Sequence, residues 1–179
     1  CLEFINNSLN IFKKDKSIGS VSGYSYAHNI NGLENIDWYK TYRHCSWSWG
    51  TWKNRWEKID WNLSKYKSSI KKSNNFRVNI KKVGDDIPIL LEGQKLKLIN
   101  SWAVRFNYHC LLNNLYSLNP RYSLTKNIGY GPNSTHTLNI FKKENIVFKK
   151  KKFKFENKDY PKFYKKINNY IYNKNKKSI

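Results

Sequence analysis

The chain has 179 residues and a formal net charge of +22, and its length is enough for one domain with a core of its own. Three cysteines without C-x-x-C spacing exclude a disulfide framework and fit a reducing cytoplasm, and no apolar run approaches the roughly 18 residues of a membrane-spanning helix. The sequence has no Met and begins with Cys1, so we expect an internal or C-terminal part of a longer protein.

The positive charge is spread unevenly along the chain. Residues 141–179 hold 14 Lys against three acidic residues, a net +11, which leaves the other half of the charge to residues 1–140. We therefore divide the chain into a domain over residues 1–140 and a Lys-rich tail over residues 141–179. Asn and Ile are abundant too, so a drift in composition explains much of the charge, and we expect no nucleic-acid partner. The tail either makes a peripheral contact with anionic lipid or is a solvated run of Lys residues.

The first half of the chain predicts a helix, a buried strand and a second helix. Apolar residues at positions 2, 5, 9 and 12 predict a helix that is already in progress at the start of the chain. Small residues alternating with Ile and Val over residues 17–24 predict a buried strand. Residues 25–40, rich in Asn and Gly, predict a loop. A helix follows from Thr51 to about Leu63, and residues 64–82 predict a surface helix and loop.

The second half continues the alternation of helices and strands. A helix is predicted to start near residues 84–91, with Pro88 in its first turn, where the missing N–H costs nothing. Residues 95–100 predict a short strand, residues 102–115 a helix, and residues 116–120 a strand that ends at a proline. Strands that alternate with helices predict an α/β fold.

The segment from Cys45 to Trp56 reads C-S-W-S-W-G-T-W-K-N-R-W, and with Trp61 it holds five of the seven tryptophans. Trp52, Trp56 and Trp61 are interpreted as core residues, the first two at helical spacing. In residues 46–50, small residues alternate with Trp, and a glycine lets the backbone approach a ligand. This pattern indicates a pocket for a flat, hydroxyl-rich ligand such as a sugar. The predicted substrate-binding residues here are Trp47, Ser48, Trp49 and Gly50.

Two adjacent acids, Asp85 and Asp86, follow a glycine at the predicted helix start. Such acids are usually solvated caps. Acids are scarce in this Lys-rich region, however, and a carboxylate at a helix start is held at a defined place, which suits a general base. We therefore take Asp86 as the candidate base and Asp85 as a substrate-binding neighbour.

Of the four histidines, His136 is the candidate for a functional role. It follows a turn-rich polar loop over residues 127–135 that can bring an imidazole to a phosphate or a metal. His109 falls on a predicted helix face and is interpreted as structural. His28 and His44 lie in or near loops without a clear partner.

Several of these segments share an order found in a known family. They are SWSWGTWKNRW (46–56), GDDI (84–87), NSWAVRF (100–106), SLTKNIG (123–129) and STH (134–136), preceded by the strand IGSVSGY (18–24). In this order they resemble the SSWGWATWKDRW, GxDL, DSWAIRW, SLVxNIG, GTH and SISGY segments of bacterial family 2 glycosyltransferases. The resemblance covers about residues 2–137. Ser48 replaces the usual Gly, which would narrow the pocket, Asn54 replaces Asp, and Ile87 replaces Leu.

The resemblance implies a GT-A fold, which is a Rossmann-like nucleotide-sugar transferase fold, of which this chain would be the C-terminal, acceptor-side part. The nucleotide-binding half would precede Cys1 and would supply most ligands of a divalent metal, Mn or Mg. By position, Trp47, Trp49 and Gly50 match the loop beside the donor sugar and the acceptor. Asp86 matches the acid that deprotonates the acceptor hydroxyl, and His136 matches a histidine that approaches the metal or the diphosphate.

The implied activity is inverting transfer of a sugar from a nucleotide-sugar donor to a glycan or lipid-linked glycan acceptor, in cell-surface polysaccharide synthesis. The enzyme would work in the cytoplasm, either free or as a peripheral protein at the inner face of the plasma membrane, and this part alone would be inactive. The alternatives are a non-catalytic basic module that binds RNA or anionic membrane, and a decayed remnant of a split gene.

Overall fold

The computed structural model describes residues 1–27, 30, 31, 33, 35–66, 68, 80, 83, 84, 86–126 and 153–155. Its elements in chain order are α1 (Leu2–Ile11), β1 (Ile18–Ser22), β2 (Trp38–Thr41), β3 (Trp49–Gly50), α2 (Lys53–Trp56), α5 (Asp86–Lys95), α6 (Trp102–Leu112) and β4 (Tyr116–Pro120). Helices and strands are mixed along the chain, so the predicted α/β class is confirmed.

The four strands form one mixed sheet in the order β2-β4-β1-β3. The two central strands, β1 and β4, are parallel, and the outer strands β2 and β3 run antiparallel to their neighbours. Therefore β1 and β4 end at the same edge of the sheet, which we call the carboxyl edge. The backbone N–H of Leu124 donates to the Gly23 carbonyl at 2.8 Å, and that of Gly23 donates to the Ser48 carbonyl at 2.7 Å. Three segments distant in sequence thus meet at this edge.

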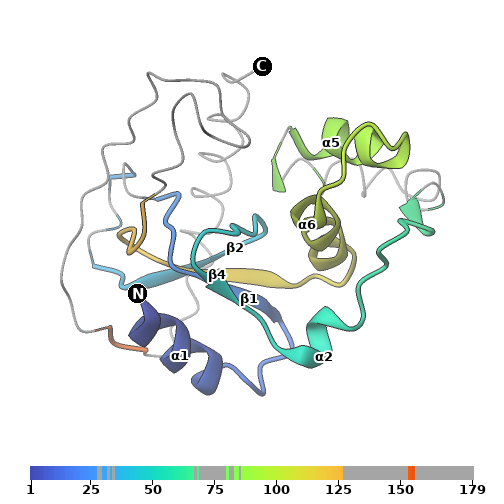
Figure 1. Cartoon of the computed structure of the whole chain (residues 1–179). Coiled ribbons are helices and arrows are strands. Elements are labelled where there is room, and N and C mark those ends of the chain that lie inside the picture. The colour runs from blue at the N-terminus through green and yellow to red at the C-terminus, as the bar shows by residue number, and fades with distance from the viewer. Residues whose placement is uncertain are drawn as a thin grey trace.

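Helices cover both faces of the sheet (Figure 1). On one face, buried side chains of α1 pack on the inward residues of the central strands; this group contains Phe4, Ile5, Phe12, Ile18, Val21 and Leu118. On the other face, α6 lies between the sheet and α5 (Figure 1). Phe106 and Cys110 of α6 pack with Ile59, and the other side of α6 packs on α5 through a second group, which contains Val104, Tyr108, Leu111, Ile87 and Leu91. Because both sides of α6 are buried, its position relative to the sheet is fixed.

The strongest periodic signals in the sequence predicted real elements. The helices expected over 2–12 and 102–115 are α1 and α6, and the strands expected over 17–24 and 116–120 are β1 and β4, with ends displaced by a few residues. All five residues of β1 are buried, as a central parallel strand requires. The helix expected near residues 84–91 is α5.

Three predicted elements were wrong. The loop predicted over 25–40 ends in β2, whose aromatic and β-branched residues favour a strand. The helix predicted from Thr51 to Leu63 stops at Trp56, and in the turn that follows the Asp60 carboxylate accepts hydrogen bonds from the Asn62 and Lys65 backbone N–H groups. The strand predicted over 95–100 is a helix end: Lys97 is left-handed, with φ 61°, and the Leu98 N–H donates to the Gly93 carbonyl at 2.9 Å.

Part of the predicted tail lies against the sheet domain. The Phe153 ring packs on Phe4 with 4.6 Å between centroids, and Phe155 packs on Phe12 at 6.4 Å. The backbone N–H of Lys154 donates to the Asp37 carboxylate at 2.9 Å. The domain boundary at residue 140 stays a prediction, and the loop predicted over 127–136 and most of the segment 64–82 lie outside the described residues. None of the described helices is long and apolar enough to cross a membrane.

Candidate functional site

The predicted substrate-binding segment, residues 46–50, lies at the carboxyl edge of the sheet. The Ser22 hydroxyl at the end of β1 donates to the Trp47 carbonyl at 3.2 Å, and the Ser48 hydroxyl donates to the Thr125 hydroxyl at 3.0 Å. Open α/β sheets bind their ligands outside the carboxyl ends of the parallel strands. The segment is therefore at the place where such a fold presents a ligand site.

The four predicted residues of this segment have different surroundings. Trp47 is half-buried and meets the Tyr24 ring edge-on at 4.7 Å, and Ser48 is exposed. Trp49 is half-buried and packs in an aromatic cluster with Phe106 and with three other rings, those of Trp56, Trp61 and Trp102. A Cβ atom on Gly50 would lie 2.9 Å from a methyl group of Leu9, so the missing side chain makes room for α1. Glycine at this position therefore has a packing reason besides the predicted approach to a ligand.

The backbone of Ser48 is in the left-handed region, with φ 45°. L-residues with a side chain are disfavoured there by contacts of the Cβ atom, whereas glycine is not. Glycine at this position would carry no such cost. Ser48 keeps the geometry at a conformational cost and adds a hydroxyl that bonds Thr125.

We expect the substitution Ser48→Gly to raise the free energy of unfolding by about 0.5–1 kcal/mol, because relief of the left-handed backbone outweighs the lost exposed hydrogen bond. Urea denaturation measures the change. Ser46→Gly is the matched control and should be neutral or destabilising, since Ser46 is not among the residues with positive φ in the described chain. Destabilisation by Ser48→Gly would show that the hydroxyl contributes more than the backbone strain.

Trp102, which is distant in sequence, contacts the same segment. It is the first residue of α6, and its ring stacks on Trp49 at 4.9 Å with 20° between the planes. Ser101 caps the helix by accepting from the Val104 N–H at 3.4 Å. The Trp102 side chain is 38% exposed, unlike the buried core rings. Sequence reasoning placed Trp102 in a helix and in the NSWAVRF segment (100–106), but did not name it as a site residue.

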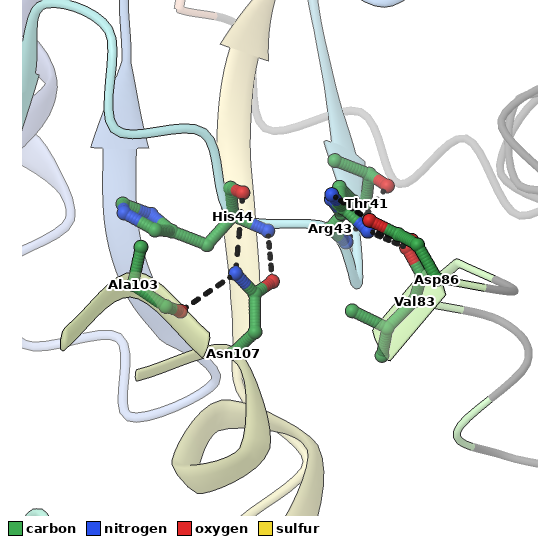
Figure 2. A network of polar contacts seen from close by, with 7 residues as sticks. All are labelled: Thr41, Arg43, His44, Val83, Asp86, Ala103 and Asn107. Carbon is green, nitrogen blue, oxygen red and sulfur yellow. Dashed lines mark hydrogen bonds and ion pairs between the residues drawn. The ribbon is translucent and has the colours of Figure 1, made fainter. Parts of the chain in front are cut away.

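Asp86, the predicted base, forms a two-point ion pair with Arg43 (Figure 2). The two guanidinium nitrogens of Arg43 donate to the two carboxylate oxygens at 2.6 and 2.8 Å, and one of them also donates to the Val83 carbonyl at 3.4 Å. Burial on its own lowers the pKa of Arg43, but its hydrogen bonds and electrostatic interactions with Asp86 and Tyr26 together raise it more, so the pKa lies above its usual range. The Asp86 side chain is 30% exposed, so part of the carboxylate stays accessible.

The residue next to Arg43 is held from two sides. The His44 backbone N–H donates to the Asn107 side-chain carbonyl at 2.9 Å, and the Asn107 amide donates to the carbonyls of His44 and Ala103 at 3.5 and 2.9 Å (Figure 2). The His44 Nδ1 atom is 2.9 Å from the Ser20 hydroxyl of β1. Asn107 thus ties α6 to the segment that carries Arg43 and leads to Trp47. No local sequence pattern marks either His44 or Asn107.

The His44 ring itself is enclosed by aromatic side chains. It meets Trp49 and Phe106 edge-on at 4.7 and 4.5 Å, and its Nε2 atom is buried without a hydrogen-bond partner among the described residues. Burial and the charge of Arg43 lower the pKa of His44 to about 3. The imidazole is therefore neutral near pH 7 and serves as a packing and hydrogen-bonding group.

The lowered pKa of His44 predicts acid sensitivity. Between pH 6.5 and about pH 3 the unfolded chain binds a proton that the folded chain does not, so stability falls as the pH falls through this window. We expect a slope of up to about 1.4 kcal/mol per pH unit below pH 6 from this residue. Urea denaturation at pH 7, 6 and 5 should give a flatter profile for His44→Phe than for the wild type. His109→Gln is the comparison variant: burial and Lys58 also lower the pKa of His109, so it should flatten the profile in the same direction but less than His44→Phe. An unchanged slope in His44→Phe would mean that other groups cause the acid sensitivity.

A buried arginine organises the loop beside this site. Arg121 follows β4, is 4% exposed, and donates to the carbonyls of Ala27, Ile30 and Leu33, the last two at 2.8 Å. These carbonyls belong to the segment that leaves β1 at the carboxyl edge and carries Tyr24, the ring partner of Trp47. Sequence reasoning did not single out Arg121.

Two predicted site residues, Asp85 and His136, lie outside the described residues. Within the described part of the chain, no group of three or more His, Cys, Asp or Glu side chains is placed to hold a metal ion. These described residues do not by themselves fit a metal centre. No family model matches the chain, and no curated protein or solved structure matches it either.

Proposed function

We propose that the chain is the acceptor-side part of an inverting glycosyltransferase that moves a sugar from a nucleotide-sugar donor to a glycan hydroxyl. The observation that carries the proposal is the position of residues 46–50 at the carboxyl edge of β1 and β4. Partly exposed indole rings and hydroxyl groups are gathered there. Aromatic faces cover the apolar C–H faces of a sugar, while hydroxyl groups fix its orientation.

In this proposal Trp47 and Trp102 contact the sugar rings, and the hydroxyl groups of Ser48 and Thr125 bond sugar hydroxyls. Asp86 takes the proton of the acceptor hydroxyl while the acceptor oxygen attacks the anomeric carbon from the face opposite the leaving diphosphate. Arg43 holds the carboxylate by both oxygens and fixes its orientation. The resemblance further assigns His136 to the side of the donor diphosphate, a role that the same proposal includes.

A sugar-binding experiment tests the proposal on the chain itself. Saturation-transfer NMR with a panel of mono- and disaccharides should show transfer from the protein to at least one sugar, and Trp47→Ala should reduce it by about tenfold, since stacking on one half-buried ring supplies much of a weak affinity. Trp61→Phe is the control, because Trp61 packs within the aromatic cluster. Equal signals for Trp47→Ala and wild type, with both folded by circular dichroism, would remove the substrate assignment of this segment.

A further inference from the structure

The turn between α5 and α6 exposes apolar side chains that the fold does not cover. Leu98 is 75% exposed, Leu96 66% and Ile89 61%. Leu96 directly follows α5, and its backbone N–H still donates to the Glu92 carbonyl at 2.9 Å, so it continues the last helical turn. Ile89 lies seven residues earlier, on the same side and two turns away. The opposite side of α5 carries Ile87 and Leu91, which are buried against α6. The exposed residues therefore do not belong to the core face of this helix.

The local backbone does not explain the exposed leucines. The helix ends with Lys97 left-handed and with the Leu98 N–H bonded to the Gly93 carbonyl. At such an end, the residue in the place of Leu98 usually packs on the side chain in the place of Gly93. Glycine offers no side chain there, and Leu98 remains in solvent. Within the described part of the chain, Leu98 thus lacks the side-chain contact that normally accompanies this motif.

Lysines alternate with these leucines in the sequence Lys95-Leu96-Lys97-Leu98. The nearest acid in α5, Glu92, hydrogen-bonds the Tyr66 side chain. Lysine stems lie along apolar surfaces while their ammonium groups stay in water, so this turn presents leucines flanked by positive charge. Of the described elements on this face of the sheet, α5 lies farthest from the strands (Figure 1).

We infer that the turn patch, formed by Ile89, Lys95, Leu96, Lys97 and Leu98, docks the protein onto an anionic lipid surface. Leucines that enter the boundary between headgroups and acyl chains, with lysines beside the headgroups, make an interfacial contact of this kind. The net charge of +22 favours the same partner over a neutral bilayer. RNA would attract the lysines but would leave the leucines in water. This inference does not depend on the proposed function.

Flotation with lipid vesicles tests the inference on the 179-residue chain. Phosphatidylcholine vesicles with and without about 30% phosphatidylglycerol are compared at about 0.1 M and 0.5 M NaCl, because the higher salt screens the contribution of exposed lysines, including those of residues 141–179. The double variant Leu96→Asn/Leu98→Asn should lower partition onto anionic vesicles by about tenfold or more at both salt concentrations. Lys95→Gln/Lys97→Gln should weaken binding chiefly at the lower salt.

Leu2→Asn is the matched control, since Leu2 is an equally exposed leucine (76%) on α1, beside Glu3. It should change partition by less than about twofold. As a second measurement, anionic vesicles should protect residues 94–100 of the wild type from hydrogen–deuterium exchange. Equal partition of the double leucine variant and wild type, absence of wild-type binding, or protection of residues 94–100 by RNA and not by vesicles would each overturn the inference.

Discussion

Arg121→Met should lower the free energy of unfolding by about 3–5 kcal/mol, the largest stability change we expect from any single substitution outside the apolar core. The guanidinium donates from its three nitrogens to three backbone carbonyls of one loop. Methionine matches the length of the side chain but donates nothing, so three carbonyls in a buried setting lose their partner at once. A loss of this size is a large fraction of the stability of a small domain.

Thermal and urea denaturation measure the change, and two variants make it interpretable. Arg121→Lys keeps the charge but has a single nitrogen, so it should fall between wild type and Arg121→Met. Arg105→Met is the matched control, because the Arg105 guanidinium donates to the exposed Asn100 side chain at 2.7 Å, and it should cost less than about 1 kcal/mol. Similar losses for Arg121→Met and Arg105→Met would mean that the loop carbonyls find water instead.

Local sequence patterns predicted the parts of this fold whose causes are local. The apolar spacing of α1 and α6 and the buried run of β1 follow directly from the side chains in each segment. The early end of α2 was missed because the pattern of apolar residues continues past Trp56, while the chain there forms a turn in which the Asp60 carboxylate bonds the backbone N–H groups of Asn62 and Lys65. The end of α5 was also missed, because the left-handed backbone of Lys97 ends the helix and the pattern of apolar residues does not show this.

The candidate site was predictable only in part, because its contacts join distant segments. The Trp-rich pattern identified residues 46–50, and the structure places them at the carboxyl edge. The Arg43–Asp86 pair spans 43 positions, and the Asn107 contact with His44 spans 63, so no short motif contains either. Asp86 could be proposed from its helix-start position, but its partner could not.

The Arg43–Asp86 pair gives the second large expected effect, on catalysis. In a preparation that contains this chain and transfers sugar, Asp86→Asn should lower kcat by about a hundredfold or more, with little change in KM. Replacing Asp86 would also have an effect if its carboxylate only anchors Arg43, because the Arg43 guanidinium, which is 18% exposed, would lose the carboxylate that pairs with it. The single variant alone therefore does not separate a base from a structural ion pair.

The double variant Arg43→Met/Asp86→Leu separates the two roles. Replacing both members of a partly buried ion pair with apolar side chains of similar size is often close to neutral, whereas removing one member costs about 1–3 kcal/mol here. We therefore expect the double variant to recover most of the unfolding free energy that Asp86→Leu loses, while its kcat remains as low as that of Asp86→Asn. Arg43→Met alone should lose stability and retain more activity than either Asp86 variant, because the carboxylate is still present. If the double variant recovers activity along with stability, Asp86 orients Arg43 and does not take the proton, and the base must be sought among other carboxylates.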